Sequence, residues 1–542
     1  MNEKPFAITL DVGTSLANKT GTWRVERPVY VDRLPPCSGA CGAGEDIQGW
    51  LYLAEGGDYE GAWRRIMDDN PLPAVMGRAC FHPCETECNR VHVDEAVGIN
   101  SVERFLGDRA IDEGWLPDPP KAATGRRVLV VGSGPGGLSA AYHLRRRGHA
   151  VTVMEAAPKP GGMMRYGIPE YRLPRPVVQA EIERIVATGV ELVCDAPVTD
   201  VVAAMADGGY EAAFVAVGAQ LGRGASIPAG DSARVLDAVA LLRTAAGGDA
   251  PMLGRHVVVY GGGDTAMDAA RTARRLGATD AVVVYRRTRD RMPAHDEEVT
   301  EAVEEGVRMR WLSTVSEAGD GALTIEKMEL DDRGFPQPTG EFEQLEADAL
   351  VLALGQQADL RLLAGLPDVT VAGGVVEVAE SMMTGQPGVF AGGDAVAGDR
   401  TLTVAVGHGR RAARAIDAWL RGEPDPTPTP LPPATADRLN PWYYSDASKT
   451  VRPHLEAARR RSTFDEVVGG LDESNALYEA RRCLSCGNCF ECDNCYGVCP
   501  DNAVIKLGVG ERYRFDYDYC KGCGICAQEC PCGAIDMIPE PT

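Results

Sequence analysis

Apolar runs that end in glycine and lead into an amphipathic stretch occur twice along the chain. Residues 126–155 read as a strand, a glycine-rich turn, a helix and a second strand, and residues 255–285 repeat this order. Strand signals return in residues 347–420, before a final helical stretch. Strands that alternate with helices form parallel sheets that are covered on both faces. The pattern predicts an α/β protein with two nested Rossmann-like domains, because the second unit interrupts the first.

The remaining segments have other patterns. The N-terminal part contains helical stretches and several cysteines, and a proline-rich stretch near residue 425 indicates an extended linker. A length of 542 residues also exceeds what one hydrophobic core supports. We therefore expect five parts: a helical N-terminal domain, residues 1–120; a first nucleotide-binding domain, residues 121–228 and 346–422; a second one, residues 229–345; a linker, residues 423–470; and a C-terminal α+β domain, residues 471–542.

The turn in the first unit has the pattern G-x-G-x-x-G, formed by Gly132, Gly134 and Gly137. Glycines there permit a tight turn and let the backbone approach a pyrophosphate, which the N-terminus of the following helix stabilises. Glu155 ends the next strand, where a carboxylate can accept hydrogen bonds from ribose hydroxyls. The flanking strand and helix, together with this acid, indicate a dinucleotide site.

The sequence GVFAGGDAV, residues 388–396, favours FAD over NAD at this first site. A strand there ends in Gly393 and Asp394, and a helix follows. The carboxylate can bind a ribityl chain, and the helix start can stabilise negative charge on the flavin ring. A buried strand with a capping aspartate is the structural alternative. Since both pieces flank an inserted second nucleotide domain, FAD is the better interpretation.

The second unit has the pattern G-x-G-x-x-A, at Gly261, Gly263 and Ala266. The strand that follows ends in Arg286 and Arg287 rather than in an acid, and further arginines come close behind. An acid there would repel a 2′-phosphate, whereas guanidinium groups bind it through paired hydrogen bonds. The sequence therefore favours NADP(H) slightly over NAD(H). A solvated basic loop is the alternative reading of these arginines.

Two cysteine runs in the tail follow C-x2-C-x2-C-x3-C-P, at residues 489–500 and 520–531. In this ferredoxin pattern the first three cysteines of a run bind one [4Fe–4S] cluster and the fourth binds the other. Structural zinc, which prefers pairs of C-x2-C, is the weaker alternative. We interpret Cys483, Cys486 and Cys532 as unligated neighbours. The predicted ligand sets are Cys489, Cys492, Cys495 and Cys530, and Cys520, Cys523, Cys526 and Cys499.

A second group of cysteines lies in the N-terminal domain. Its members can complete one further cluster with a thiol to spare. A zinc site and unligated thiols are the alternatives. These cysteines are Cys37, Cys41, Cys80, Cys84 and Cys88.

Charge, hydropathy and the distribution of the cysteines disfavour several classes of partner and location. The net charge of −23 disfavours nucleic acid and anionic membranes as partners, although an acidic surface also serves solubility. We find no signal segment and no apolar run of about 18 residues that could span a bilayer. All cysteines except Cys194 lie in the two groups, which favours metal binding over disulfides. We expect a cytoplasmic protein.

Six motifs support a family resemblance: PPCSGAC, GRACFHPCETEC, GSGPGGLSAA, GGMMRYGIPEYRLP, GGGDTAMDAARTA and GVFAGGDAV. With these motifs in this order, about residues 30–420 resemble the glutamate synthase small-subunit family. That family includes the NADPH-oxidising half of dihydropyrimidine dehydrogenase and NADH-dependent ferredoxin–NADP reductase relatives. The stretch EARRCLSCGNC resembles the family's C-terminal end. Residues 489–535 resemble the small ferredoxin subunit of 2-oxoacid oxidoreductases.

The fingerprints and the resemblance together define the candidate site residues. Those for FAD are Gly132, Ser133, Gly134, Gly137, Glu155, Gly162, Met163, Arg165, Gly393, Asp394 and Thr403. Those for NAD(P) are Gly261, Gly263, Asp264, Ala266, Arg286, Arg287 and Arg291. No catalytic side chain is assigned.

One departure from the family concerns the N-terminal clusters. Relatives hold two clusters there and have more cysteines ahead of the position of Cys37; this chain lacks those cysteines. We therefore expect one N-terminal cluster, and about three [4Fe–4S] clusters in all. The resemblance leaves the fourth ligand open and implies Cys41, Cys80 and Cys84 together with Cys37, Cys88 or Glu103.

Nicotinamides carry electrons in pairs and iron–sulfur clusters carry them singly, while a flavin does both. The sequence thus predicts an electron-transfer subunit that connects NAD(P)(H), FAD and the clusters. The ferredoxin-like tail favours a thiamine pyrophosphate-dependent 2-oxoacid oxidoreductase (of the phenylglyoxylate, 2-oxoglutarate or pyruvate type) as the partner. One alternative is the small subunit of an NADPH-dependent glutamate synthase, for which the tail is superfluous. The other is a regulatory scaffold, against which the intact fingerprints argue.

Overall fold

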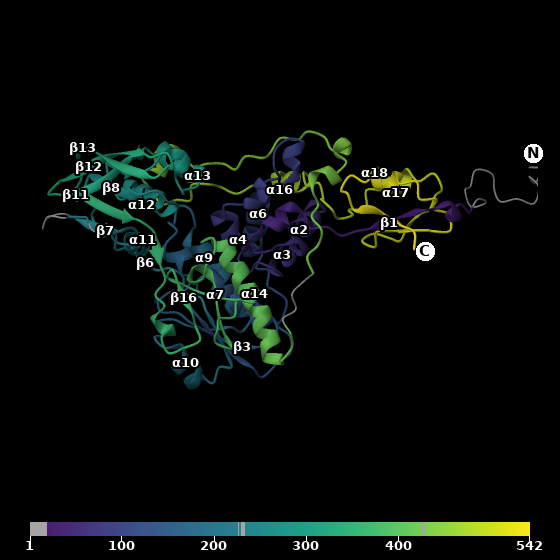
Figure 1. The fold of residues 1–542 in the computed structure, drawn as a ribbon, viewed down its shortest axis with the longest axis horizontal. Coiled ribbons are helices and arrows are strands. Elements are labelled where there is room, and N and C mark those ends of the chain that lie inside the picture. The colour runs from purple at the N-terminus through teal and green to yellow at the C-terminus, as the bar shows by residue number, and fades with distance from the viewer. Residues whose placement is uncertain (1–18, 226, 229–233, 425–428, 542) are drawn as a thin grey trace, which may run out of the picture.

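The computed structural model describes residues 19–225, 227–228, 234–424 and 429–541. Part of the expected border near residue 229 and part of the expected linker lie outside these ranges. Figure 1 shows the N-terminal helices at the centre, with the second nucleotide-binding domain on one side, the cysteine-rich C-terminal domain on the other and the first nucleotide-binding domain below. None of the helices in the described ranges combines the length and apolarity that a bilayer crossing requires.

The first nucleotide-binding domain contains a parallel five-stranded sheet. Its strands are β2 (Arg127–Val131), β3 (Ala150–Met154), β4 (Glu191–Val193), β5 (Ala212–Val215) and β18 (Val389–Ala391). They lie in the order β18–β5–β2–β3–β4, with β2 at the centre. The apolar residues of β2 are fully buried because helices cover the sheet, and helix α14 (Leu402–Arg421) packs along α7 (Pro135–Arg146). The other helices are α8 (Met163–Tyr166), α9 (Arg175–Ala187) and α10 (Val201–Gly208).

The second nucleotide-binding domain also has a parallel five-stranded sheet. Its strands are β7 (Val235–Asp237), β8 (His256–Gly261), β9 (Asp280–Val284), β10 (Arg308–Arg310) and β14 (Ala349–Ala353), in the order β10–β9–β8–β14–β7. Its helices are α11 (Ala238–Ala246), α12 (Asp264–Arg275) and α13 (Asp296–Glu304). An antiparallel sheet adds β11 (Ser313–Ala318), β12 (Ala322–Leu330) and β13 (Pro336–Glu346). The predicted α/β class with two Rossmann-like domains is confirmed.

The chain passes between the two nucleotide-binding domains at a pair of short strands. β6 (Leu221–Gly222) and β15 (Gln356–Gln357) pair with each other antiparallel and mark where the chain leaves and re-enters the first domain. β14 therefore belongs to the second sheet, where it pairs with β8, although the sequence pattern placed it in the first domain. The apolar run of β14 reads the same in either sheet, so sequence periodicity could not decide this.

The N-terminal domain is a compact set of helices. They are α1 (Pro36–Ala40), α2 (Ile47–Glu55), α3 (Tyr59–Met67), α4 (Pro73–Ala79), α5 (Pro83–Thr86) and α6 (Ile99–Asp112). Asp46 and Asp58 cap α2 and α3 by accepting hydrogen bonds from backbone amides one turn ahead. Trp50 and Trp63 are fully buried in its core. The helices α1, α4 and α5 carry or flank the cysteines of this domain.

The cysteine-rich C-terminal domain includes a strand from the other end of the chain. β1 (Glu26–Tyr30) pairs antiparallel with β21 (Ile535–Pro539), and Figure 1 shows the purple strand within the yellow domain. A second antiparallel pair is β19 (Val504–Lys506) with β20 (Tyr513–Phe515). Two short helices, α17 (Asn494–Gly497) and α18 (Ile525–Gln528), carry central cysteines.

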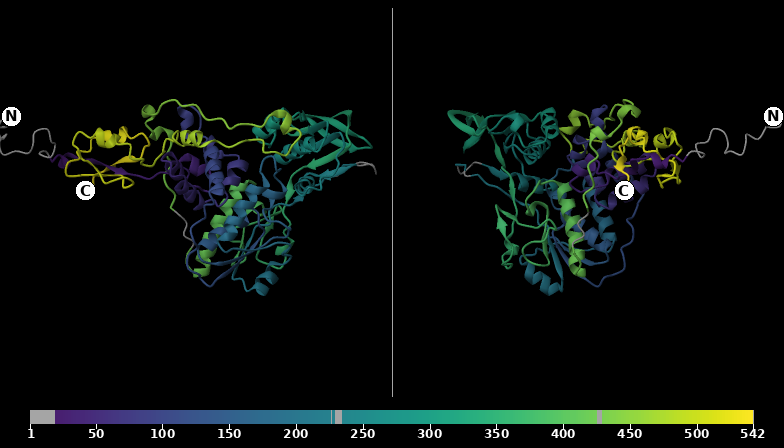
Figure 2. Two further views of the ribbon diagram at one scale, coloured as in Figure 1. Left: turned by 180° about the vertical axis from the view of Figure 1, so that it is seen from behind. Right: turned by 45° about the vertical axis from the view of Figure 1, so that its right-hand side comes forward.

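The proline-rich segment after α14 is extended and held against the rest of the chain. The amide of Leu34 donates to the carbonyl of Pro432 at 2.8 Å. Farther on, Arg460 forms an ion pair with Glu304 of the second nucleotide-binding domain at 2.6 Å. Figure 2 shows the segment running out to that domain and back. It then enters α16 (Glu473–Ala480), which packs on α2 and α6.

Candidate functional site

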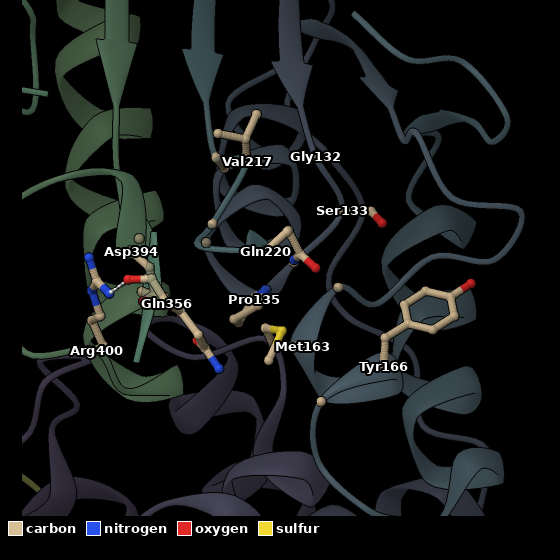
Figure 3. Close-up of a pocket in the computed structure, with 18 of the residues that line it drawn as sticks. Gly132, Ser133, Pro135, Met163, Tyr166, Val217, Gln220, Gln356, Asp394 and Arg400 are labelled. Carbon is tan, nitrogen blue, oxygen red and sulfur yellow. Dashed lines mark hydrogen bonds between the residues drawn. The ribbon is translucent and has the colours of Figure 1, made fainter. Parts of the chain in front are cut away.

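A cavity of about 710 Å³ lies at the carboxyl ends of the strands of the first sheet. Ligands of open α/β sheets bind at this edge. The wall is formed by the segments that directly follow β2, β3, β5 and β18, and Figure 3 shows their side chains around one space. The predicted FAD residues on this wall are Gly132, Ser133, Gly134, Glu155, Gly162, Met163, Gly393 and Asp394.

The glycine-rich turn between β2 and α7 fits a pyrophosphate. Gly132 has a φ of +98°, a left-handed conformation that favours glycine. A Cβ on Gly137 would lie 1.9 Å from the carbonyl oxygen of Gly132, so this glycine is needed for close packing of the turn. A Cβ on Gly134 would meet no atom within 4 Å, although this residue lines the cavity and caps α7. Free space at a helix N-terminus suits a phosphate group.

The same turn holds the carboxylate of Glu155 at the cavity. Its Oε2 accepts hydrogen bonds from the amide and the hydroxyl of Ser133, at 2.9 and 2.5 Å, and its Oε1 accepts one from the amide of Ala157 at 2.8 Å. Oε2 thereby uses both of its acceptor sites, whereas Oε1 can accept one further hydrogen bond. Glu155 can therefore still bind a ribose hydroxyl, and Ser133 serves to orient it.

Asp394 lies on the turn after β18, on another part of the wall. Burial raises the pKa of its carboxyl, and the positive charge of Arg400 opposes this rise. Arg400 Nη1 is itself fixed by donating to the backbone oxygen of Gln356 at 2.8 Å (Figure 3). The amide of Gly393 donates to Nδ1 of His408 at 3.1 Å. Hydroxyl groups of a ribityl chain would supply donors to this half-buried carboxylate.

Three predicted FAD residues do not line this cavity. Gly137 lies behind the turn, where it packs against Gly132. Arg165 is buried, and its Nε donates to the backbone oxygen of Pro160 at 2.5 Å. This hydrogen bond holds the turn before α8 in place. The hydroxyl of Thr403 lies 3.7 Å from the thiol of Cys80 and faces the N-terminal domain.

The second nucleotide-binding domain contributes part of the same wall, which sequence reasoning missed. Asp264, predicted as an NAD(P) residue, lines this first cavity, as do Thr265 and Gln356. The Asp264 carboxylate accepts a hydrogen bond from the amide of His295 at 2.9 Å. Thr265 and Gln356 also line the cavity of the second domain, so the two cavities adjoin. No local motif marks these residues, because only the docking of the two domains brings them here.

The second cavity, of about 520 Å³, lies at the carboxyl ends of β8, β9 and β14. Its wall includes Gly261, Gly263, Arg286 and Arg287. The Nε of Arg287 is buried and has no hydrogen-bond partner in the described part of the chain. An anionic group would satisfy such a donor, and guanidinium groups bind phosphates well. The residues present thus fit a nicotinamide dinucleotide with a 2′-phosphate.

Two other predicted NAD(P) residues lie off this wall. Ala266 is fully buried, in the first turn of α12. Arg291 lies beside Gly334, where a Cβ would come within 2.3 Å of its Nη1. The cluster of arginines after β9 is therefore divided, with Arg286 and Arg287 facing the cavity.

The structure brings the members of each predicted ferredoxin ligand set together. One set encloses a cavity of about 20 Å³, lined by Cys499, Cys520, Cys523 and Cys526. In the other set, burial raises the pKa of the Cys489 thiol, and the neighbouring charges of Cys530 and Cys492 add to this. Burial also raises the pKa of the fourth member, Cys495, and the charges of the same three thiols add to this rise. The donor chemistry and the spacing of both sets fit [4Fe–4S] clusters.

Two side chains outside the ligand pattern touch these thiols. The hydroxyl of Tyr30, at the end of β1, lies 3.4 Å from Sγ of Cys495. The thiol of Cys532 lies 3.7 Å from that of Cys530, and this hydrogen bond lowers the pKa of Cys530. Hydrogen bonds to ligand sulfurs tune the reduction potential of a cluster. Sequence spacing shows Cys532 but gives no sign of Tyr30.

In the N-terminal domain, four predicted ligands enclose a cavity of about 10 Å³. The carboxylate of Glu103 accepts a hydrogen bond from Nδ2 of Asn70 at 3.0 Å. Burial raises the pKa of Glu103 well above its ordinary value, and the charge of Glu45, which also lines the cavity, adds to this. Coordination to an iron ion of a cluster would favour the ionised carboxylate in this place. The four residues are Cys41, Cys80, Cys84 and Glu103.

Cys37 and Cys88 do not join this set. They line a different cavity, and Ile99 borders both. Within the described ranges, no three His, Cys, Asp or Glu side chains are placed to share a single metal ion. The thiols surround small spaces instead, and a cubane binds each ligand through a different iron.

Two adjoining nucleotide cavities next to thiol-lined spaces define an FAD- and NAD(P)-dependent oxidoreductase with iron–sulfur sites. Residues 126–410 match the pyridine nucleotide-disulphide oxidoreductase family, and the chain belongs to this family. Residues 25–115 match the 4Fe–4S domain II of dihydropyrimidine dehydrogenase, and residues 513–536 match a 4Fe–4S binding domain. The predicted family resemblance and enzyme class are confirmed.

Several curated relatives are named as subunits or chains of oxidoreductases. The chain is 36% identical over 504 residues to the NADP(+)-dependent formate dehydrogenase subunit beta of Moorella thermoacetica, covering 83% of this chain and 70% of the relative. It is 32% identical to the NADPH-Fe(3+) oxidoreductase subunit beta of Geobacter sulfurreducens, with 85% and 77% covered. It is 34% identical to the glutamate synthase [NADPH] small chain of Azospirillum brasilense, with 72% and 87% covered. Of YgfK from Escherichia coli, 34% identical, the chain spans only 50%.

Solved structures resemble part of the chain at low sequence identity. Thioredoxin reductase from Lactococcus lactis aligns with a TM-score of 0.44 at 21% identity, covering 55% of this chain and 99% of that one. FprA from Mycobacterium tuberculosis, in complex with NADPH, aligns with a TM-score of 0.46 at 18% identity, covering 55% and 85%.

Proposed function

We propose that this chain, as one subunit of a larger oxidoreductase, passes electrons between NADP(H) and a catalytic partner through FAD and its iron–sulfur sites. The observation that carries this proposal is the succession of sites along the molecule. Thr265 and Gln356 border both nucleotide cavities. Thr403, beside Leu402 of the FAD cavity, lies 3.7 Å from Cys80 of the N-terminal thiol set. We place the chain in the cytoplasm, where thiols stay reduced.

The residues of the first cavity would hold FAD in an extended form. The amides of the Gly132–Gly134 turn and the start of α7 would bind the pyrophosphate, and Glu155 and Asp394 would bind the ribose and ribityl hydroxyls. Bound FAD exchanges electrons in pairs with a nicotinamide and singly with clusters. The chain's own part is to orient the two nucleotides toward each other across Thr265 and Gln356.

We infer that NADP(H) is preferred to NAD(H). Arg286 and Arg287 line the second cavity, and the buried Nε of Arg287 has no partner among the described residues. The names of the Moorella and Geobacter relatives specify NADP(+) and NADPH. A 2′-phosphate is the group that separates the two nucleotides, and two guanidinium groups would bind it.

We propose a thiamine pyrophosphate-dependent 2-oxoacid oxidoreductase as the catalytic partner. The support is the ferredoxin-like domain at the end of the chain, which offers a cluster near the surface: Cys523 is exposed. Formate oxidation is the second candidate, favoured by 36% identity to a formate dehydrogenase beta subunit over 83% of the chain. A glutamate synthase partner is the third, as the small-chain relative covers 72% of the chain.

The experiment is to purify the complex anaerobically through a tag on this chain and to identify the copurified subunits. Each candidate substrate is then added without nicotinamide: pyruvate or another 2-oxoacid with coenzyme A, formate, or glutamate. We expect the flavin absorbance to bleach with a 2-oxoacid and then with NADPH. Bleaching with formate or glutamate alone would replace the proposed partner, and no bleaching with NADPH would overturn the electron-transfer function.

A further inference from the structure

Two cysteines outside the ferredoxin pattern lie in the N-terminal domain rather than in the tail. Cys483 and Cys486 follow α16, which packs on α2 and α6. Between them and the helix, Arg482 is 2% exposed, and its Nη1 lies 2.5 Å from Glu479 Oε1. The same Glu479 oxygen accepts a hydrogen bond from the amide of Gly98 at 2.6 Å. A buried ion pair that also binds backbone fixes this segment in place.

There Cys483 and Cys486 meet Cys37 and Cys88. The four side chains line one small cavity, which we call the four-thiol cavity. Its remaining wall is largely apolar and includes Leu51, Val97 and Ile99. The volume of about 20 Å³ equals that of the cavity enclosed by Cys499, Cys520, Cys523 and Cys526 in the ferredoxin-like domain. The four-thiol cavity therefore matches the ferredoxin-like site in its number of cysteines and in its volume, and the cysteines of that site follow a known cluster pattern.

Hydrogen-bond donors surround these thiols. The amide of Ser485 donates to Sγ of Cys483 at 3.4 Å, and the side chain of Asn89 hydrogen-bonds to Cys486. Backbone groups of Arg90 and Val97 bind Cys88. Such donors stabilise thiolates and cluster sulfurs rather than neutral thiols. They are placed to donate to the sulfurs of a bound cluster.

We propose that Cys37, Cys88, Cys483 and Cys486 bind a further [4Fe–4S] cluster. This is one cluster more than the sequence indicates, and it assigns Cys483 and Cys486 a role that spacing does not reveal. It also leaves Glu103 as the fourth ligand beside Cys41, Cys80 and Cys84. The ligands come from three distant segments, so no linear pattern contains them.

The position of this cluster follows from its ligands. Cys37 lies one helical turn before Cys41, Cys88 lies one turn after Cys84, and Ile99 borders both cavities. On the other side, the amide of Gly487 donates to the carbonyl of Cys532 in the ferredoxin-like domain at 2.6 Å. The cluster therefore lies between the other N-terminal set and the ferredoxin-like domain. It would also tie the end of α16 to the N-terminal domain through metal–sulfur bonds.

Zinc is the competing occupant, because four cysteines also bind zinc and Cys483 and Cys486 form one C-x2-C pair. A zinc site would serve structure only, since zinc has no redox chemistry in proteins. It would need the four sulfurs to converge on one ion. Among the described residues, no three His, Cys, Asp or Glu side chains do so. The geometry favours the cubane.

The test compares three forms of the full chain, purified anaerobically: wild type, Cys483→Ala with Cys486→Ala, and Cys194→Ala as a control for loss of a cysteine. Iron, acid-labile sulfide, zinc and FAD are measured per chain, and EPR spectra are recorded after reduction with dithionite. Four clusters require about 16 iron atoms per FAD in the wild type and in Cys194→Ala. We expect about 12 in the double variant, with the loss of one spin.

A second variant covers the case in which the double variant fails to fold, shown by loss of FAD. In Cys486→Ser the serine oxygen can still ligate iron, so we expect FAD and iron to stay near the wild-type content and one EPR signal to change its g-values. About 12 iron atoms in the wild type, one zinc per chain, or unchanged EPR signals in Cys486→Ser would each overturn the proposal. None of these readouts depends on NADP(H) or on a partner subunit.

Discussion

Nη1 of Arg172 lies 2.9 Å from Oδ2 of Asp268, and this buried ion pair joins the FAD-binding domain to helix α12 of the NAD(P)-binding domain. Nη2 of Arg172 also reaches Glu298, at 2.6 Å. Beside it, Tyr171 is fully buried and lies against the guanidinium groups of two arginines of α12. Arg172 and Tyr171 belong to the motif GGMMRYGIPEYRLP, whose C-terminal part thus forms the joint between the two domains.

Arg172→Ala should loosen this joint. The variant leaves the Asp268 carboxylate buried without its main partner, and breaking one side of a buried pair costs about 3–5 kcal/mol. We expect the thermal transition of the NAD(P)-binding domain in calorimetry to move to lower temperature, and NADPH-driven reduction of ferricyanide to slow. Lys327→Ala removes an exposed pair with Glu341 and should change neither quantity. Equal melting of both variants would show that the pair contributes nothing to docking.

Two glycines of the first fingerprint should respond differently to alanine. A Cβ on Gly134 meets no protein atom within 4 Å, whereas a Cβ on Gly137 would lie 1.9 Å from the Gly132 oxygen. Gly134→Ala should therefore fold normally but bind FAD at least about tenfold more weakly, because the methyl group takes the space of the pyrophosphate. Gly137→Ala should give little folded protein.

The measurement for this pair is the FAD content after purification together with the far-UV circular dichroism spectrum. Gly114→Ala is the control, since Gly114 lies outside the cavity and its Cβ would meet nothing within 4 Å. Because Gly114 has a φ of +69°, alanine there should cost a little stability, but it should not change the FAD content. Full FAD content in Gly134→Ala would contradict a pyrophosphate at this turn.

Local sequence could predict the two glycine-rich turns and the grouping of the ferredoxin cysteines, because each depends on residues within one strand–turn–helix unit or one short run. It could not predict contacts between distant segments. The pairing of β1 with β21 places Tyr30 beside Cys495, yet the two residues lie at opposite ends of the chain. Gln356 reaches both nucleotide cavities only because the domains dock. Such residues carry no local signal.

The proposed preference for NADPH should depend on Arg286 and Arg287. Charge-assisted hydrogen bonds contribute roughly 1.5–3 kcal/mol each, so the loss of two guanidinium groups in the double variant Arg286→Ala, Arg287→Ala should raise KM for NADPH by at least about 100-fold. KM for NADH should change little, because NADH lacks the 2′-phosphate. Steady-state ferricyanide reduction with each nucleotide gives both values.

Arg289→Ala is the matched control, because this exposed arginine of the same loop does not line the cavity. It should leave both constants unchanged. An equal rise of KM for NADPH and NADH in the double variant would retire the NADP assignment, and an effect of Arg289→Ala on NADPH alone would point to a general charge effect.

Tyr30→Phe should lower the reduction potential of the cluster that Cys495 is predicted to bind. The Tyr30 hydroxyl lies 3.4 Å from the Cys495 sulfur, and a donor there stabilises the more negative, reduced cluster. A hydrogen bond worth roughly 0.5–1.5 kcal/mol corresponds to about 20–60 mV for one electron. Potentiometric titration followed by EPR measures the shift. Tyr517→Phe, whose hydroxyl donates to the Pro28 carbonyl, is the control and should leave that potential unchanged.

His408 should make the protein less stable in acid. Burial, assisted by the charge of Arg411, lowers the pKa of His408 to about 4, while its Nδ1 accepts the amide of Gly393 at 3.1 Å. An unfolded histidine has a pKa near 6.5, so between about pH 6.5 and 4 the unfolded chain binds more protons than the folded one. This contribution to stability is complete above pH 6.5 and is lost as the pH falls toward 4. Allowing for partial solvent screening, it amounts to roughly 1–2 kcal/mol.

His408→Asn keeps an acceptor for the Gly393 amide but removes the titrating ring. Thermal midpoints of wild type and variant, measured from pH 7.5 down to pH 5, should therefore converge as the pH falls, with the variant showing the flatter profile. Comparison of the two forms cancels acid loss of clusters, which affects both. His92→Asn removes an exposed histidine and should follow the wild-type curve. Parallel curves for wild type and His408→Asn would show that His408 does not govern the acid limb.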